Sequence, residues 1–455
     1  MNTKKKYLLH FIFLSALGFS LVFYGCGHSS SPTPPPVEDP YLTHAKLTSQ
    51  LTTLATMGGA WGGYIGAVVT EIGDTVLSLS SGTTLPVQKG VIHYQWPDPE
   101  GGTDRTLSAL TLAPRPASGI LSVPVIAYQH GTQVYRSCEP SSFGQSLLAV
   151  LSNPETGGSI QNYLEGVIGA YIATTGALVV MPDYPGFGSD TGMHPYIHQS
   201  LGESVRLAID SAIQKLENGD FGSRLQWNGQ VFLIGYSEGG YATMSAARAI
   251  QLYKDANPES WTATAAIAMA GPHDLSTVGR QSFVSTAFYP APHYYAFALV
   301  SWNRIETPDD NELFNLLKEE YRTETFENLF NGRKSTIEIL EAMGFPATPA
   351  ALLDSAGIDA FADPGDPDWL GTILEKNDTW RGWTPGFPVK LFHCTEDEIV
   401  PFTHSQNAAT RMASPHVQAP AAVVPLDLPE LSVGVHTLGF VPAMRSGIEA
   451  IFDLY

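Results

Sequence analysis

The stretch VFLIGYSEGG, Val231–Gly240, is an apolar run that ends at a serine held between glycines. Its four apolar residues predict a buried parallel strand, and the following YATMSAARAIQLY, residues 241–253, predicts a helix. A sharp strand-to-helix turn brings the residues two before and two after the serine close together, which requires small side chains. Gly235 and Gly239 meet that requirement. Ser237 is therefore expected to present its hydroxyl clear of the sheet, although the same five-residue pattern also occurs in ordinary turns.

Length, composition and charge limit the classes of protein to which this chain can belong. The chain has 455 residues, of which 44% are hydrophobic, so it can bury a sizeable core in one large domain or two small ones. The formal net charge of -20 argues against a nucleic-acid partner, because lysine and arginine cluster only at the extreme N-terminus. The acidity is expected to keep an exported protein soluble.

Residues 1–26 have the pattern of an export signal. Three lysines at positions 4–6 precede an apolar run, residues 7–24, and Gly25-Cys26 then resembles a bacterial lipobox. In that interpretation Cys26 is the lipid attachment site, and residues 27–40, rich in proline and serine, form a tether between the membrane and the protein. The alternatives are a conventional signal peptide and an uncleaved anchor. We therefore expect an exported protein, either a membrane-anchored lipoprotein (periplasmic or at the cell surface) or a secreted one.

Strands alternate with helices through most of residues 41–455. This alternation predicts an α/β fold with a mostly parallel central sheet covered on both faces, whose reactive loops lie at the carboxyl ends of the strands. Residues 41–79 are expected to form a surface-packed N-terminal extension. The expected strands are residues 87–96, 106–113, 123–128, 177–181, 231–234, 263–270, 389–392 and 422–426, the first two forming an antiparallel edge; helices are expected at 199–216 and 441–454.

The interval from about residue 281 to 384 does not follow this alternation. It is aromatic and partly helical in pattern, so we predict a helical cap, or lid, inserted over the mouth of the sheet. A helical elaboration without contact to ligand is the alternative. Its aromatic residues are expected to line an apolar acyl pocket or to form the core of the cap; they are Phe288, Tyr289, Tyr294, Tyr295, Phe297 and Trp302.

A serine hydroxyl needs a histidine to take its proton, and that histidine needs a carboxylate to fix its tautomer. After a serine on such a turn, the acid and then the histidine follow along the chain. Ser237, Asp397 and His436 satisfy this order: Asp397 comes just after a predicted strand, and His436 is expected in the loop before the last helix. Glu396 and Glu398 are alternative acids. The histidines His404 and His416 also follow Ser237 but are less well placed.

An oxyanion hole requires two backbone N–H groups that point at the developing negative charge. Glu238, directly after the serine, is expected to supply one of them from the start of the following helix. Gly131 or Thr132, in the loop after the strand at 123–128, is expected to supply the other. His130 is expected to hold that loop in place rather than to catalyse.

Four motifs together resemble an α/β-hydrolase, and the resemblance covers about residues 86–455. The finer pattern of Ala127-Tyr128-Gln129 followed by Cys138-Glu139-Pro140-Ser141 is similar to the secretory lipases of the fungal lipase A type. One departure is Cys394, where α/β-hydrolases commonly have glycine after the histidine; a Cys138–Cys394 disulfide and two buried thiols remain alternatives. The four motifs are Gln129-His130-Gly131, residues 183–188 (DYPGFG), residues 235–240 (GYSEGG) and His393 through Asp397 to Pro401.

The resemblance implies hydrolysis of a lipid or small-molecule ester through an acyl-serine intermediate, without metal or cofactor. Ser237 would attack the carbonyl carbon, His436 would carry the proton and Asp397 would hold His436. The rival interpretations are a serine peptidase of the prolyl-oligopeptidase type, whose large β-propeller does not fit in the short N-terminal part, and a non-catalytic surface binding protein with the same fold.

Overall fold

The computed structural model describes residues 41–455 except 58, 145–155, 308–310 and 366–367. The export signal, Cys26 and the tether lie outside the described residues. The core is an eight-stranded sheet with strand order β1-β2-β4-β3-β5-β6-β7-β8, antiparallel from β1 to β4 and parallel from there on. This confirms the predicted α/β fold class. The strands are β1 (Val87–Trp96), β2 (Arg105–Pro114), β3 (Leu121–Gln129), β4 (Leu178–Pro182), β5 (Leu225–Tyr236), β6 (Ala265–Met269), β7 (Val389–His393) and β8 (Ala421–Ala422).

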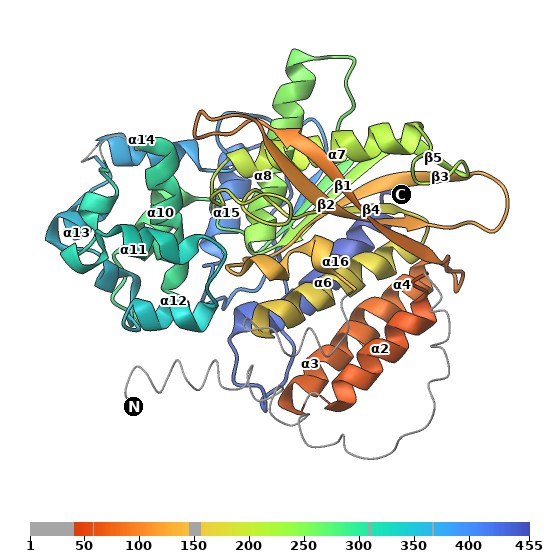
Figure 1. Ribbon diagram of the computed structural model, residues 1–455, viewed down its shortest axis with the longest axis horizontal. Helices are drawn as coiled ribbons and strands as arrows, with labels where there is room; N and C mark the ends of the chain where they lie inside the picture. Colours follow the sequence, from red (N-terminus) through yellow and green to blue (C-terminus); the bar gives the residue numbers. More distant parts are fainter. Residues whose placement is uncertain (1–40, 58, 145–155, 308–310, 366–367) are drawn as a thin grey trace, which may run out of the picture.

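Helices cover both faces of the sheet (Figure 1). Side chains along β5 alternate between two apolar cores: Val231 and Leu233 pack with α7 and α8, whereas Phe232 and Ile234 pack with α6 and α16. All four side chains are fully buried, which explains why this part of the strand is a continuous apolar run in the sequence. The helices of these layers are α6 (Thr156–Thr174), α7 (Ser200–Glu217), α8 (Glu238–Ala256), α15 (Thr403–Met412) and α16 (Val435–Phe452).

The N-terminal segment packs against α6 and α16 as an additional helical layer (Figure 1). Leu47 and Leu51 are fully buried in the core shared with those helices. The segment is therefore part of the folded core and not only a surface layer. It contains α2 (His44–Met57), α3 (Gly62–Ala67), a π-helical turn η2 (Val68–Gly73) and α4 (Asp74–Leu79).

The segment between β6 and β7 forms a group of helices at one end of the molecule, on the left in Figure 1. After residues 270–274, which follow β6, its first helical element is a π-helical turn, η5, and α10 is its most buried helix. Its elements are η5 (Leu275–Gly279), α9 (Arg280–Phe283), α10 (His293–Glu306), α11 (Glu324–Glu327), α12 (Thr336–Ala342), α13 (Ser355–Ala362) and α14 (Asp368–Lys376).

The last helix differs from its prediction, because α16 begins at Val435 and not at 441. His436 therefore lies in the first turn of a helix and not in a loop before it. The helix runs through Pro442, whose missing N–H would leave the carbonyl of Leu438 without its helical partner. The N–H of Leu426 donates to that carbonyl at 3.0 Å, so the helix continues past the proline. β8 is also shorter than the strand predicted at 422–426.

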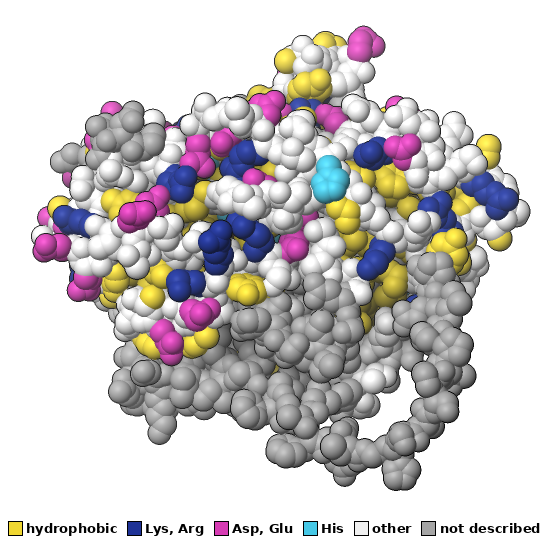
Figure 2. All heavy atoms as spheres, in the orientation of Figure 1, with side chains coloured by type: hydrophobic (Ala, Val, Ile, Leu, Met, Phe, Trp, Pro, Cys, Tyr) yellow, Lys and Arg dark blue, Asp and Glu magenta, His cyan; other side chains and the backbone are white. Residues whose placement is uncertain are grey.

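Charged side chains of both signs are scattered over the face shown in Figure 2. Among the described residues, no helix is both long enough and apolar enough to cross a membrane.

Candidate active site

Ser237 lies between the end of β5 and the start of α8. Its backbone has φ 61° and ψ −124°, a left-handed conformation that strains a residue with a side chain. A Cβ on Gly235 would lie 2.4 Å from the carbonyl oxygen of Gly239, and one on Gly239 would lie 2.1 Å from that of Gln129. The close approach inferred from the sequence is therefore present, and only glycine fits at these two positions.

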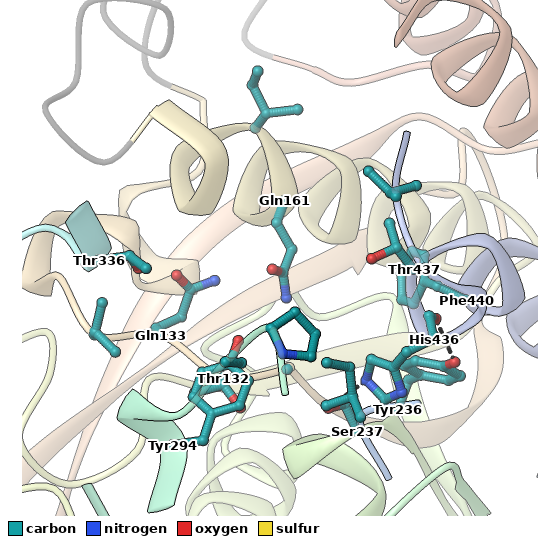
Figure 3. Close-up of a pocket in the computed structure, with 18 of the residues that line it drawn as sticks. Thr132, Gln133, Gln161, Tyr236, Ser237, Tyr294, Thr336, His436, Thr437 and Phe440 are labelled. Carbon is teal, nitrogen blue, oxygen red and sulfur yellow. Dashed lines mark hydrogen bonds between the residues drawn. The ribbon is translucent and has the colours of Figure 1, made fainter. Parts of the chain in front are cut away.

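His436 connects Ser237 to Asp397. Its Nε2 lies 2.9 Å from Oγ of Ser237, and its Nδ1 lies 2.6 Å from Oδ2 of Asp397. An ionised carboxylate can only accept, so Nδ1 donates to Asp397 and Nε2 is left to accept the serine proton. Figure 3 shows the imidazole beside Ser237. The three residues predicted from their order along the chain thus form one hydrogen-bonded chain of side chains.

The Asp397 carboxylate is held from several directions. Its Oδ1 accepts the backbone N–H groups of Ile399 and Val400 at 2.9 and 2.8 Å, and Nε2 of His393 lies 3.2 Å from Oδ2. Burial alone would raise the pKa of Asp397, but His436 and His393 outweigh burial and lower the pKa below 3.8. Asp397 is therefore ionised at neutral pH.

The backbone of His436 is fixed at both of its polar groups. Its N–H donates to Oε2 of Glu398 at 3.2 Å, and its carbonyl accepts the Tyr236 hydroxyl at 2.7 Å. Burial would lower the pKa of this imidazole, but the charge and hydrogen bond of Asp397, together with the charge of Glu398, raise the pKa above 6.5. The imidazole is thus set up to receive a proton.

The alternative acids and bases lie elsewhere. Glu396 is exposed, and Glu398 contacts the backbone of His436 and not its ring. His404 is buried, and its Nδ1 accepts the backbone N–H of Asp274 at 3.0 Å. His416 is exposed.

Two backbone N–H groups near Ser237 are available to a ligand. Within the part of the chain that the structure describes, no acceptor lies on the N–H of Glu238 or of Thr132. The N–H of Gly131, in contrast, donates to Oε1 of Glu165 at 3.2 Å. Of the two upstream candidates, Thr132 therefore has its N–H available and Gly131 does not.

The peptide that carries the Thr132 N–H is held in one orientation. Nδ1 of His130 donates to the carbonyl of Gly131 at 2.7 Å, and the Tyr184 hydroxyl donates to the carbonyl of His130 at 3.1 Å. The C=O and N–H of a trans peptide point in opposite directions, so fixing the Gly131 carbonyl also fixes the direction of the Thr132 N–H. Burial lowers the pKa of His130, which keeps the ring neutral. These contacts agree with a structural role for His130.

The side chain of Glu238 is turned away from solvent, with 1% of its surface exposed. Its Oε1 lies 2.6 Å from Nε2 of His194, whose Nδ1 donates to the carbonyl of Pro185 at 2.9 Å. The pair ties the start of α8 to the loop after β4. This contact gives the Glu238 side chain a structural role. Its Oε2 and its backbone N–H have no hydrogen-bond partner among the described residues.

Two cavities meet at Ser237. The larger has a volume of about 260 Å³. Most of its wall is apolar, but Thr132, Gln133, Gln161 and His436 are part of it, and for these side chains we call it the polar cavity (Figure 3). The smaller has a volume of about 70 Å³, and we call it the aromatic cavity. Its aromatic wall consists of Tyr196, Phe283, Tyr289, Tyr294, Tyr295 and Trp302.

The segment between β6 and β7 contributes to both cavities. Four of the six aromatic residues singled out in its sequence line the aromatic cavity: Tyr289, Tyr294, Tyr295 and Trp302. Phe297 instead stacks on Phe330 and on Tyr196, which comes from the loop between β4 and α7, and Phe288 is exposed. Some aromatic residues of this segment thus line a cavity and others do not, and an acyl pocket there stays a prediction.

Sequence reasoning missed several residues around Ser237. Trp61 and Tyr64 reach the polar cavity from the N-terminal segment, and Gln133, Gln161 and Glu165 reach it from the loop after β3 and from α6. Only Glu165 carried a signal, as a lone acidic residue within the apolar run YLEGVIGAYIA, residues 163–173.

The two described cysteines, Cys138 and Cys394, are buried and form no disulfide with each other. Over the described residues, no group of three or more histidine, cysteine or acidic side chains is arranged to hold a metal ion.

A scan of the sequence against protein-family models and a search of curated proteins returned no match. Solved structures, in contrast, are similar over most of the chain. The rice cell wall degrading esterase LipA from Xanthomonas oryzae superposes with a TM-score of 0.64 at 21% identity, over 84% of this chain and 94% of that chain. A protein described as a hydrolase from Legionella pneumophila gives a TM-score of 0.64 at 20% identity, with coverages of 84% and 94%.

Candida antarctica lipase A, in its closed state, superposes with a TM-score of 0.54 at 15% identity, over 77% of this chain and 74% of the lipase. At these identities the similarity establishes the architecture. Together with the strand order, the turn at Ser237 and the helices on both faces, it shows that this chain has the α/β-hydrolase fold.

Proposed function

We propose that this protein is a serine hydrolase that cleaves carboxylic esters through an acyl-serine intermediate. The observation that carries the proposal is the hydrogen-bonded chain from Ser237 through His436 to Asp397, which lies at the meeting point of two cavities. The available N–H groups of Glu238 and Thr132 supply the charge stabilisation that acyl transfer requires. The structural neighbours described as an esterase and a lipase support the choice of an ester substrate.

In the proposed reaction, Oγ of Ser237 attacks the carbonyl carbon while Nε2 of His436 takes its proton. The carbonyl oxygen becomes negative between the two N–H groups. The C–O bond to the alcohol then breaks, the alcohol oxygen receives the proton from His436, and the acyl group stays on Ser237. Water, activated by His436, releases the acid.

The test is hydrolysis of p-nitrophenyl esters by the purified protein and by Ser237→Ala. We expect the variant to remain folded, by circular dichroism, and to lose activity by a factor of about 10³ or more. Full activity in this variant would refute the mechanism. Peptide amides assayed in parallel distinguish the peptidase alternative, which predicts cleavage of amides without preference for esters. Absence of any Ser237-dependent turnover would favour the binding-protein alternative.

We also propose that the protein is exported and carries a lipid on Cys26. The support is the pattern of residues 1–26 and the proline-rich stretch that follows. Expression of the full chain and of Cys26→Ser in a bacterial host tests this. Radiolabelled palmitate should be incorporated into the unchanged chain and not into the variant; equal labelling of both, or of neither, would contradict lipid attachment.

A further inference from the structure

The two cavities contact different residues around Ser237. His436 lines the polar cavity, together with Thr132 and Gly434, and does not line the aromatic cavity. Glu238 lines the aromatic cavity and not the polar one, while Ser237 belongs to both. The position of Ser237 between them means that an ester bound at its Oγ extends one arm into each cavity.

The proton transfer decides which arm enters which cavity. The alcohol oxygen leaves only when it receives the proton held on Nε2 of His436, so the alcohol arm must lie on the side of that atom. That side is the polar cavity. The acyl arm, which stays attached to Ser237, then extends past the start of α8 into the aromatic cavity.

The aromatic cavity limits the size and polarity of the acyl group. Its volume is about 70 Å³. The polar cavity, at about 260 Å³, is almost four times as large, so the aromatic cavity suits the smaller of the two arms of the ester. Leu275 and Ala298, both almost fully buried, are also part of the wall. Its other residues include Ile197, Ile399 and Val400 and the polar Glu238 and His404. A short apolar acyl group fits within this volume, whereas a long fatty acyl chain would have to extend beyond it.

The polar cavity is larger, and hydrogen-bonding side chains form part of its mainly apolar wall. Gln161 extends from α6 toward Ser237, and Gln133 lies on another side of the same space (Figure 3). Gln133 is 2% exposed, and neither polar atom of its amide has a hydrogen-bond partner among the described residues. A buried amide without partners is unfavourable, and a bound hydroxyl group would satisfy it.

We propose that the enzyme acts on esters of a short apolar acid with a bulky, hydroxyl-bearing alcohol, holding the acid in the aromatic cavity and the alcohol in the polar cavity. This inference rests on the proposed function and adds the substrate class. The acyl-serine intermediate keeps its short chain in the aromatic cavity while the alcohol departs through the polar cavity, from which water then enters.

The first test is a chain-length series of p-nitrophenyl acetate, butyrate, octanoate and dodecanoate, measured as kcat/KM. We expect acetate or butyrate to be the best substrate and octanoate to be slower by about tenfold or more. Leu275→Ala enlarges the aromatic cavity and should improve octanoate relative to butyrate. Ala298→Phe fills the cavity and should reduce butyrate relative to acetate.

The matched control is Val433→Ala, a truncation of similar kind in the wall of the polar cavity. It should leave the chain-length profile unchanged. A wild-type profile that peaks at octanoate or dodecanoate overturns the size argument. A profile that responds to Val433→Ala and not to Leu275→Ala reverses the assignment of the two arms. Neither result affects the proposed function, which fails only if no acyl ester is hydrolysed in a Ser237-dependent way.

The second test concerns the alcohol. The acetyl esters of a simple alcohol and of a sugar are compared for the unchanged protein and for Gln133→Leu. We expect the sugar ester to be preferred, and the variant to lower the ratio of kcat/KM for the sugar ester to that for the simple ester by about tenfold. An unchanged ratio would overturn the role of Gln133 in recognition of the alcohol. Thermal melts of all variants confirm that they fold.

Discussion

The backbone N–H of Gly131 donates a hydrogen bond to Oε1 of Glu165 at 3.2 Å. Glu165 lies on α6 and is 1% exposed, and its Oε1 also accepts from Nε2 of Gln161 at 3.2 Å. Burial raises the pKa of this carboxyl to about 7, although the two hydrogen bonds act in the opposite direction. A buried acid thus holds the loop that carries the Thr132 N–H, and it changes charge near neutral pH.

We predict that Glu165→Gln removes a pH dependence of stability. Because the pKa of Glu165 is higher in the folded protein, about 7, than the ordinary 4.5, the folded state binds this proton more tightly. The resulting stability is complete below about pH 4.5 and is lost as the pH rises to about 7. The free energy of unfolding of the unchanged protein, relative to the variant, should therefore fall from pH 5 to pH 7 and level off above. Urea titrations at pH 5, 6, 7 and 8 measure it, and a constant difference would contradict the prediction.

Glu398 provides a second pH test. Its charge contributes to raising the pKa of His436 above 6.5, after the larger contribution of Asp397. Catalysis needs the neutral imidazole, so kcat/KM for an ester should fall on the acidic side with a midpoint above pH 6.5. Glu398→Gln keeps an acceptor for the His436 N–H and removes the charge, so this midpoint should move to lower pH. Glu396→Gln, the exposed neighbour, is the control, and equal shifts in both variants would mean that only net charge matters.

The turn at Ser237 yields a stability prediction. A Cβ on Gly239 would overlap the carbonyl oxygen of Gln129, a backbone atom that cannot move aside. We expect Gly239→Ala to reduce the free energy of unfolding by about 3 kcal/mol or more. Gly66→Ala is the control, because this glycine lies in α3 and no atom lies within 4 Å of the position that a Cβ would take. This substitution should raise the free energy of unfolding by about 0.5–1 kcal/mol. Similar effects of both substitutions would mean that the turn can relax.

The sequence predicted the sheet and the three interacting side chains for related reasons. A strand buried on both faces must be apolar throughout, so β5 and β6 can be recognised in the sequence as runs of apolar residues. The residues predicted for the site lie in the loops that follow such strands. Asp397 comes four residues after the end of β7, and Ser237 one residue after the end of β5. Because the carboxyl ends of parallel strands lie at the same edge of the sheet, residues that follow different strands in the sequence lie close together in the structure.

Other parts of the site could not be predicted because they depend on contacts between distant segments. The partners Gly131 and Glu165 are 34 residues apart, and nothing local marks them as a pair. The predicted start of α16 was wrong for a comparable reason. Proline is most common in the first turn of a helix, so Pro442 favoured a start near residue 441. The helix begins earlier, at Val435, and the N–H of Leu426, from another segment, donates to the carbonyl that the proline leaves without a helical partner. The wall supplied by Trp61 and Tyr64 likewise depends on how the N-terminal helices pack.

The strained backbone of Ser237 provides the last prediction. Its φ of 61° is unfavourable for any residue with a Cβ, and strain of this kind costs about 1–3 kcal/mol. Ser237→Ala keeps the Cβ and therefore keeps the strain, whereas Ser237→Gly releases it at the expense of a more flexible unfolded chain, about 0.5–1 kcal/mol. Both variants lose the proposed nucleophile, but the glycine variant should be more stable than the alanine variant by up to about 2.5 kcal/mol. Chemical denaturation of the two inactive proteins under identical conditions measures the difference, and an alanine variant that is equally or more stable would show that the turn holds Ser237 without strain.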